Sequence, residues 1–113
     1  MKDLKISKEL LSEVLNYEVD AFLGINKNEI DYTCCRDKNE GYIDISINIY
    51  EFAFKCKEWA RDKYNITISS ALYKNYAKSW NVDKDKSYTA KTEVEVIIKA
   101  CEGILEGLKN ERV

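Results

Sequence analysis

Apolar residues recur at helical spacing in three segments of the chain. In the first, Leu10, Leu11, Val14 and Leu15 form one apolar face, Ser7 is placed to cap the helix and Asn16 to end it. The second runs from about residue 49 to residue 64. Ser46 or Asn48 can cap this middle helix.

The third helical segment follows a T-x-x-E capping box made by Thr92 and Glu95. Its apolar seam has spacings of three and four residues and is widened by Ile98 and Leu105. The seam consists of Val94, Ile97, Cys101, Ile104 and Leu108.

Period-two alternation predicts two hairpins elsewhere in the chain. The first joins residues 30–35 to residues 43–47 through "RDKNEG", and residues 17–24 before it are predicted only to be extended. The second joins residues 66–72 to 76–82 through "YKN". Helical spacing of Tyr73, Tyr76, Ala77 and Trp80 leaves a helix open there, although strand is favoured.

Together these elements predict an α+β fold of order α-ββ-α-ββ-α, with three helices packed on a small antiparallel sheet. "DKDK" at 83–86 is predicted to be a solvated loop. The 113 residues have the length of one domain, and no linker or repeat divides them. We therefore expect a single domain over residues 1–113.

Composition and charge argue against two classes of partner. The 18 basic and 20 acidic side chains are interspersed and give a net charge of −2, so a nucleic-acid partner is not favoured. No stretch reaches the about 18 apolar residues of a membrane span, and the N-terminus lacks the apolar core of a signal peptide. We expect a cytoplasmic protein without a membrane partner.

The side chains that carry out common enzyme chemistry are missing or scattered. The chain has no histidine, which excludes Ser–His and Cys–His nucleophilic sites, and none of its four glycines stands in a phosphate-loop motif. Cys34 and Cys35 are adjacent while Cys56 and Cys101 stand alone, so no zinc-ligand spacing exists. We expect buried free thiols, no metal, no cofactor and no catalysis.

The middle helix carries more aromatic rings than one apolar face needs. Tyr50, Phe54, Lys57 and Arg61 follow spacings of four, three and four and share a second face. Rings beside cations can stack on a planar group and neutralise phosphate, which suits a nucleotide. The alternative is that Phe54 packs beneath the first helix and the cations only flank it.

Arginine is scarce in this lysine-rich chain. Its three arginines are Arg36, Arg61 and Arg112, and each offers a planar fork for phosphate. With Trp80 as a further ring, the candidate ligand site comprises Arg36, Tyr50, Phe54, Lys57, Arg61, Trp80 and Arg112. The alternative is that the arginines are separate surface charges.

The final helix also has a second stripe, of small residues. Val96, Ala100, Gly103 and Gly107 are spaced four, three and four apart, and two glycines inside a helix cost about 1 kcal/mol each relative to alanine. Such a stripe lets another backbone approach closely. It predicts either packing within the chain or a symmetric homodimer through this helix.

Two segments, "INIYEFAFKCKEWA" and "TAKTEVEVIIKACEGIL", resemble small phage and prophage proteins of the phage α-β-α sandwich type over about residues 47–105. The helix entry of that family is more acidic; here Lys91 replaces an acid and Val94 a proline. The resemblance implies a phage setting and no general activity. More weakly, the chain resembles anti-Thoeris proteins, which sequester cyclic ADP-ribose isomers.

These features predict a non-catalytic counter-defence protein that sequesters a phosphate-bearing, cyclic nucleotide signal such as a cyclic ADP-ribose isomer. One alternative is a protein-interaction inhibitor of a bacterial defence effector, for example an anti-CRISPR, with the aromatic face as its hot spot. Another is a phage accessory protein without a ligand.

Overall fold

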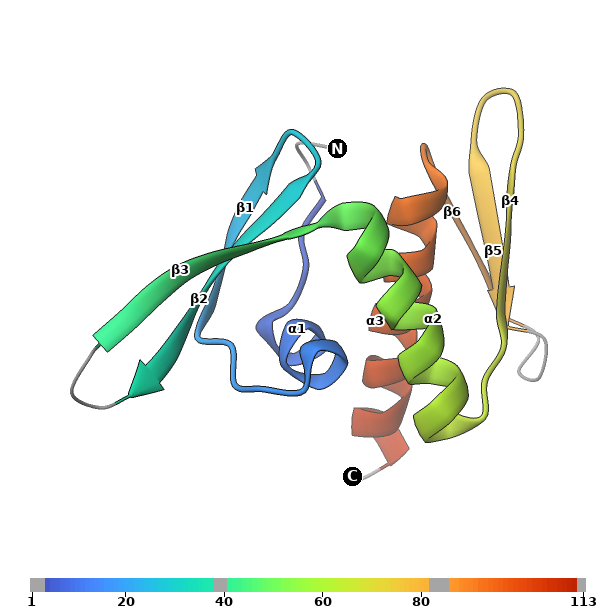
Figure 1. The fold of residues 1–113 in the computed structure, drawn as a ribbon. Helices are drawn as coiled ribbons and strands as arrows, with labels where there is room; N and C mark the ends of the chain where they lie inside the picture. The colour runs from blue at the N-terminus through green and yellow to red at the C-terminus, as the bar shows by residue number, and fades with distance from the viewer. Residues whose placement is uncertain (1–3, 38–40, 82–85, 112–113) are drawn as a thin grey trace. The chain divides into compact units, whose positions relative to one another are not determined.

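Each predicted hairpin carries one more strand than the sequence indicated. The computed structural model describes residues 4–37, 41–81 and 86–111, and its element order is α-βββ-α-βββ-α (Figure 1). The strands form two three-stranded antiparallel sheets, so the α+β class is confirmed and the strand number is corrected. The chain divides into two compact units, Met1–Phe52 and Ala53–Val113. A single domain stays a prediction.

Helix α1 (Lys8–Leu15) has both of the predicted ends. The hydroxyl oxygen of Ser7 accepts a hydrogen bond from the Leu10 amide at 3.1 Å. Asn16 ends the helix in the left-handed region with φ 60°, a conformation that asparagine tolerates at this position. Leu10 and Leu11 are completely buried, as the apolar face predicted.

The first sheet has the order β1-β2-β3, with strands Ala21–Asn26, Glu29–Asp37 and Gly41–Asn48. Ile30, Tyr32 and Cys34 are buried at alternate positions of β2, which confirms the first hairpin. Strand β1 was missed because its pairing shifts register between Phe22 and Gly24, which interrupts the alternation that marks a strand.

Helix α2 (Ile49–Tyr64) follows Asn48, which caps it, and ends before Asn65. The side-chain oxygen of Asn48 accepts hydrogen bonds from the amides of Tyr50 at 2.9 Å and Glu51 at 3.4 Å. Asn65 adopts φ 55°, and its amide donates to the Arg61 carbonyl at 3.0 Å, which closes the helix with a left-handed cap. Both predicted boundaries are confirmed.

The second sheet has the order β4-β5-β6, with strands Ile68–Leu72, Ala77–Asn81 and Lys86–Ala90. The strand interpretation of the second hairpin is confirmed over its helical alternative. The predicted loop at 83–86 is wrong at Lys86, which begins β6, while residues 83–85 lie outside the described residues. Strand β6 was missed because it has little apolar pattern. It is held in the sheet by backbone pairing with β5.

Helix α3 (Glu93–Glu111) contacts all three strands of the second sheet and lies along one of its faces (Figure 1). The Thr92 hydroxyl accepts a hydrogen bond from the Glu95 amide at 3.3 Å, which confirms the predicted cap. On β5, Ala77 and Ser79 are fully buried, and the Ser79 hydroxyl donates to the Val96 carbonyl at 3.0 Å. Small side chains on both surfaces let the helix lie close to the sheet.

The part of α2 that begins at Ala53 belongs to the second unit. Cys101 of α3 places its sulfur 3.6 Å from the Cys56 carbonyl of α2, and both thiols are fully buried. Cys34, Cys56 and Cys101 are free and buried, as predicted. In the described part of the chain no helix is long and apolar enough to cross a membrane.

Candidate functional site

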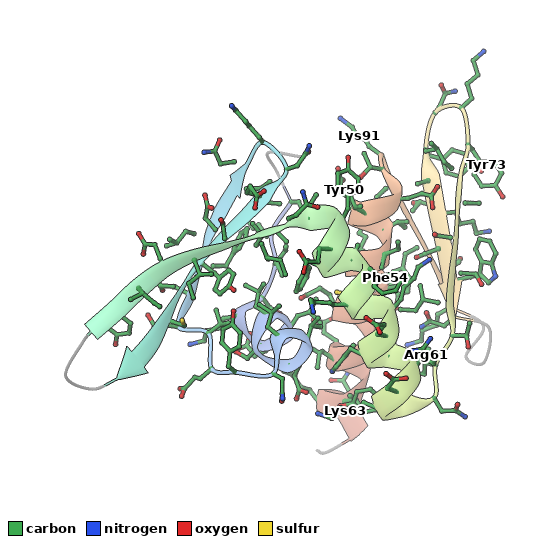
Figure 2. All side chains as sticks on the ribbon, viewed as in Figure 1. Tyr50, Phe54, Arg61, Lys63, Tyr73 and Lys91 are labelled. Atoms are coloured by element: carbon green, nitrogen blue, oxygen red, sulfur yellow. The ribbon has the colours of Figure 1, made fainter. Side chains whose placement is uncertain are left out.

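The aromatic face of α2 is exposed. Phe54 is 64% exposed and Tyr50 is 56% exposed, so neither ring belongs to the core (Figure 2). Tyr50 lies in the first unit and Phe54 in the second. The alternative that Phe54 packs beneath the first helix concerns a contact between the two units and stays a prediction.

Of the two cations predicted beside Phe54, Arg61 forms an ion pair with an acidic neighbour. The Arg61 guanidinium binds the Asp62 carboxylate at 2.9 Å, and both side chains are largely exposed. Asp62 is also the main cause that raises the pKa of Arg61, with a smaller contribution from Glu58. Lys57 is half-buried. This face therefore offers an exposed ring and a mixed charge, not a concentrated positive potential.

The remaining predicted site residues are not brought to this face by any described contact. Trp80 is half-buried on β5, at a position that alternates with the inward-facing Ser79 and Asn81. Arg36 belongs to β2 in the first unit, and its side chain lies outside the described residues, as does all of Arg112. A joint site of the three arginines stays a prediction.

The stripe of small residues on α3 is used within the chain. Val96 and Ala100 are completely buried, and a Cβ atom built on Gly103 would lie 2.0 Å from the Tyr88 hydroxyl. A Cβ atom on Gly107 would meet nothing within 4 Å. Packing within the chain thus accounts for the first three positions, and homodimerisation stays a prediction. Gly107 borders open space.

That open space is a cavity of about 140 Å³ in the second unit. It lies between α3 and the end of the sheet where β5 finishes and β6 begins, and the end of α2 closes it. Its lining is polar and apolar in about equal parts, and comprises Tyr64, Ile66, Asn81, Lys86, Tyr88, Gly103, Ile104, Gly107 and Leu108.

Asn81, one of the residues that line this cavity, is a buried polar residue. Its side chain is only 2% exposed, and its Oδ1 atom has no hydrogen-bond partner among the described residues. A buried acceptor without a partner costs about 1–3 kcal/mol. Ser79, two residues earlier on the same sheet face, is satisfied by the Val96 carbonyl. The Trp59 indole N–H is also buried without a partner among the described residues, and Trp59 does not line the cavity.

Tyr88 and Lys86 bring a ring and a cation to the same place. They are two residues apart on β6 and so project from the same face of the strand. Burial raises the pKa of Tyr88, and the charge of Glu106 raises it further, so the hydroxyl stays protonated at neutral pH. Lys86 is exposed, which places its ammonium group at the solvent side.

The cavity combines ring, amide and cation, but in residues that the sequence did not single out. They come from α2, β5, β6 and α3, and no local pattern joins positions so far apart. One signal was available: Asn81 continues the inward-facing series of Ala77 and Ser79, and a polar residue at a core position needs a partner or a function.

Metal chemistry gains no support from the described residues. No group of three or more Cys, Asp or Glu side chains is placed there to hold an ion. Comparison of the chain with protein-family models, with curated proteins and with solved structures found no match. Function is therefore inferred from the cavity and from the exposed face of α2.

Proposed function

We propose that this chain is a non-catalytic binding protein that captures a small, phosphate-bearing molecule of the nucleotide class in the cavity of its second unit. One observation carries the proposal: a cavity of about 140 Å³ is lined together by the rings of Tyr64 and Tyr88 and by the cation Lys86. A concave site with a few convergent polar groups is the usual form of a small-molecule site. Lys86 supplies a cation for phosphate.

Binding without turnover fits the side chains available. The chain lacks histidine, and the described residues that line the cavity include no carboxylate and no thiol. Tyr88 is kept protonated by its surroundings, so it is a poor base. A bound nucleotide should accordingly be recovered unchanged, which chromatography of the ligand released by denaturation can test.

The biological setting that we propose is phage counter-defence through sequestration, as the resemblance to phage and prophage proteins implies. A sequestering protein needs stoichiometric binding and no second substrate. The cyclic ADP-ribose isomers that anti-Thoeris proteins capture are one candidate class. Mononucleotides and cyclic dinucleotides complete the panel to be tested.

Thermal unfolding in the presence of these nucleotides tests the proposal. A ligand at a hundred times its dissociation constant adds about 2.7 kcal/mol to the free energy of unfolding. Gly107→Leu should abolish that gain, because the new side chain enters open space and fills the cavity without a backbone clash. Phe54→Ser on the exposed face of α2 is the matched control and should leave the gain intact.

The opposite effects of these variants would place the ligand site on the face of α2 and not in the cavity. If Phe54→Ser and Arg61→Ala abolish the gain while Gly107→Leu keeps it, the ligand binds the face of α2 as the sequence predicted. If no nucleotide stabilises the chain, the proposed function is wrong.

A second candidate is a protein-interaction inhibitor, favoured by the exposed ring of Phe54. Exposed aromatic side chains are typical hot spots, and a helix face can dock in an apolar groove. A bacterial defence effector is the proposed target. Loss of effector inhibition with Phe54→Ser, and its retention with Gly107→Leu, would support this function over nucleotide capture.

A further inference from the structure

We propose that a second copy of this chain pairs with the free edge of β4, so that two copies join their second sheets into one continuous antiparallel sheet. Strand β4 lies at one edge of the order β4-β5-β6 and pairs with β5. Helix α3 packs on a face of this sheet, which leaves the edge of β4 without a neighbouring strand among the described residues (Figure 1). The contact needs no ligand, so it is independent of nucleotide capture.

The hairpin turn determines which backbone groups of β4 point outward. The Tyr73 amide donates to the Tyr76 carbonyl at 2.8 Å, so these two residues form a hydrogen-bonded pair. Hydrogen-bonded and non-hydrogen-bonded pairs alternate along an antiparallel ladder, and the register of β4 with β5 has no shift. The N–H and C=O groups of Ile68, Ser70 and Leu72 therefore point away from β5, toward the free edge.

The opposite edge of the same sheet agrees with this alternation. Lys78 of β5 directs its backbone groups to β4, so Thr89, its partner on β6, directs its own groups outward. The Lys99 ammonium group of α3 donates to the Thr89 carbonyl at 3.0 Å, as an outward carbonyl allows. The edge of β6 is therefore partly occupied by a lysine of its own chain, which is one way in which proteins protect an edge strand.

The edges of the first sheet also carry features that oppose pairing. Strand β1 has a register shift between Phe22 and Gly24, and β3 has the exposed charge of Asp44. Residues 65–73, which contain β4, have no charged side chain, although 34% of the chain is charged. Among the edge strands that the structure describes, β4 is thus the one with a regular register and no charge.

A second copy fits this edge because antiparallel pairing about Ser70 is self-complementary. Ser70 lies opposite Ser70 of the second copy, and Ile68 lies opposite Leu72, so every outward backbone group meets its complement. In a two-fold contact each strand faces its own sequence. A charged strand would repel itself there, whereas β4 brings no like charges of its own together.

The same register covers two large exposed side chains. Leu72 is 64% exposed and Tyr73 is 48% exposed, and Tyr73 lies beside the turn that follows β4 (Figure 2). In the paired sheet Leu72 contacts Ile68 of the second copy, and Tyr73 contacts Thr67. The Tyr73 ring is already stacked on Tyr76, with ring centroids 5.0 Å apart, so its ordering costs little on association.

Sedimentation velocity of the full chain over a range of concentrations tests the proposal, and we expect a monomer–dimer equilibrium. Ser70→Pro removes an outward N–H that β5 does not use and should leave a monomer. Ser87→Pro is the matched control, because Ser87 has the equivalent outward position on the edge of β6, and it should still dimerise.

A second pair of variants keeps the test decisive if Ser70→Pro does not fold. Leu72→Lys puts a charge on an exposed side chain beside the edge and should weaken the dimer by about tenfold or more. Tyr42→Lys, at an exposed tyrosine of the first sheet, is its control and should leave the dimer unchanged. Dimerisation that resists both Ser70→Pro and Leu72→Lys would overturn the proposal.

Amide hydrogen exchange locates the contact within the dimer. The amides of Ile68, Ser70 and Leu72 should exchange about tenfold or more slowly in the dimer than in the dilute monomer, while the Ser87 amide should not change. A dimer in which the three amides exchange as fast as in the monomer would overturn the proposal. A chain that stays monomeric at every concentration would also overturn it and would leave the edge to an extended peptide of another protein.

Discussion

At the scale of single residues, the packing of the second unit depends on two glycines of α3, which have no side chain. Gly103 and Gly107 lie one turn apart on α3, yet their surroundings differ. The Tyr88 hydroxyl occupies the position of a Cβ atom at Gly103, whereas Gly107 faces open space. The same substitution should therefore have opposite effects at the two positions.

Gly107→Ala should stabilise the chain by up to about 1 kcal/mol, since alanine favours a helix and meets no neighbour. Gly103→Ala should destabilise it by about 1–3 kcal/mol, because Tyr88 must leave its position. Urea denaturation of both variants measures the difference. Equal stability of the two would show that Tyr88 does not pack on Gly103.

Tyr88 should also make stability depend on alkaline pH. Its folded-state pKa is raised above the ordinary 10.0, chiefly by burial and then by Glu106. The stability that the protonated phenol contributes is complete below that ordinary value and is lost as pH rises through the raised pKa.

Between pH 9 and 11, Tyr88→Phe should therefore lose less of its free energy of unfolding than the parent chain loses. Tyr42→Phe, at an exposed tyrosine of the first sheet, is the matched control and should follow the parent. A Tyr88→Phe curve parallel to that of the parent would contradict the assignment.

At the scale of elements, the helices are defined by their ends. Ser7, Asn48 and Thr92 each accept hydrogen bonds from the first turn of the following helix. These interactions are local, so a short stretch of sequence is enough to predict them. Strands β1 and β6 behave differently, because each is held by pairing with a neighbour in the sheet.

Asn48→Ala should destabilise the chain by about 1 kcal/mol, because the amides of Tyr50 and Glu51 lose their acceptor. Asn48→Ser should restore most of that loss, since serine caps helices well. Thermal unfolding followed by circular dichroism measures both variants. If alanine and serine give the same stability, the cap at Asn48 does not hold α2.

At the scale of the whole molecule, α2 is continuous across the boundary between the two compact units. Both tryptophans, Trp59 and Trp80, belong to the second unit, so tryptophan fluorescence reports on that unit alone. Circular dichroism reports on both units. The two signals therefore distinguish one cooperative domain from two independent ones.

We expect the two signals to give the same urea midpoint, because unfolding one unit would fray the helix that the other also uses. The test requires only the parent chain. Separate midpoints would instead indicate two domains and would contradict the single domain predicted from the sequence.

The sequence by itself determined the three helices, their caps and the two central hairpins, because periodicity and capping act over a few residues. Only the tertiary structure decided the rest. The helical spacing of Phe54 fits a buried ring as well as an exposed one. Strand β6 forms through backbone pairing, and the pattern of its side chains does not predict a strand. The cavity is lined by residues that lie far apart in the chain, from Tyr64 to Leu108, and contacts between such residues carry no local signal.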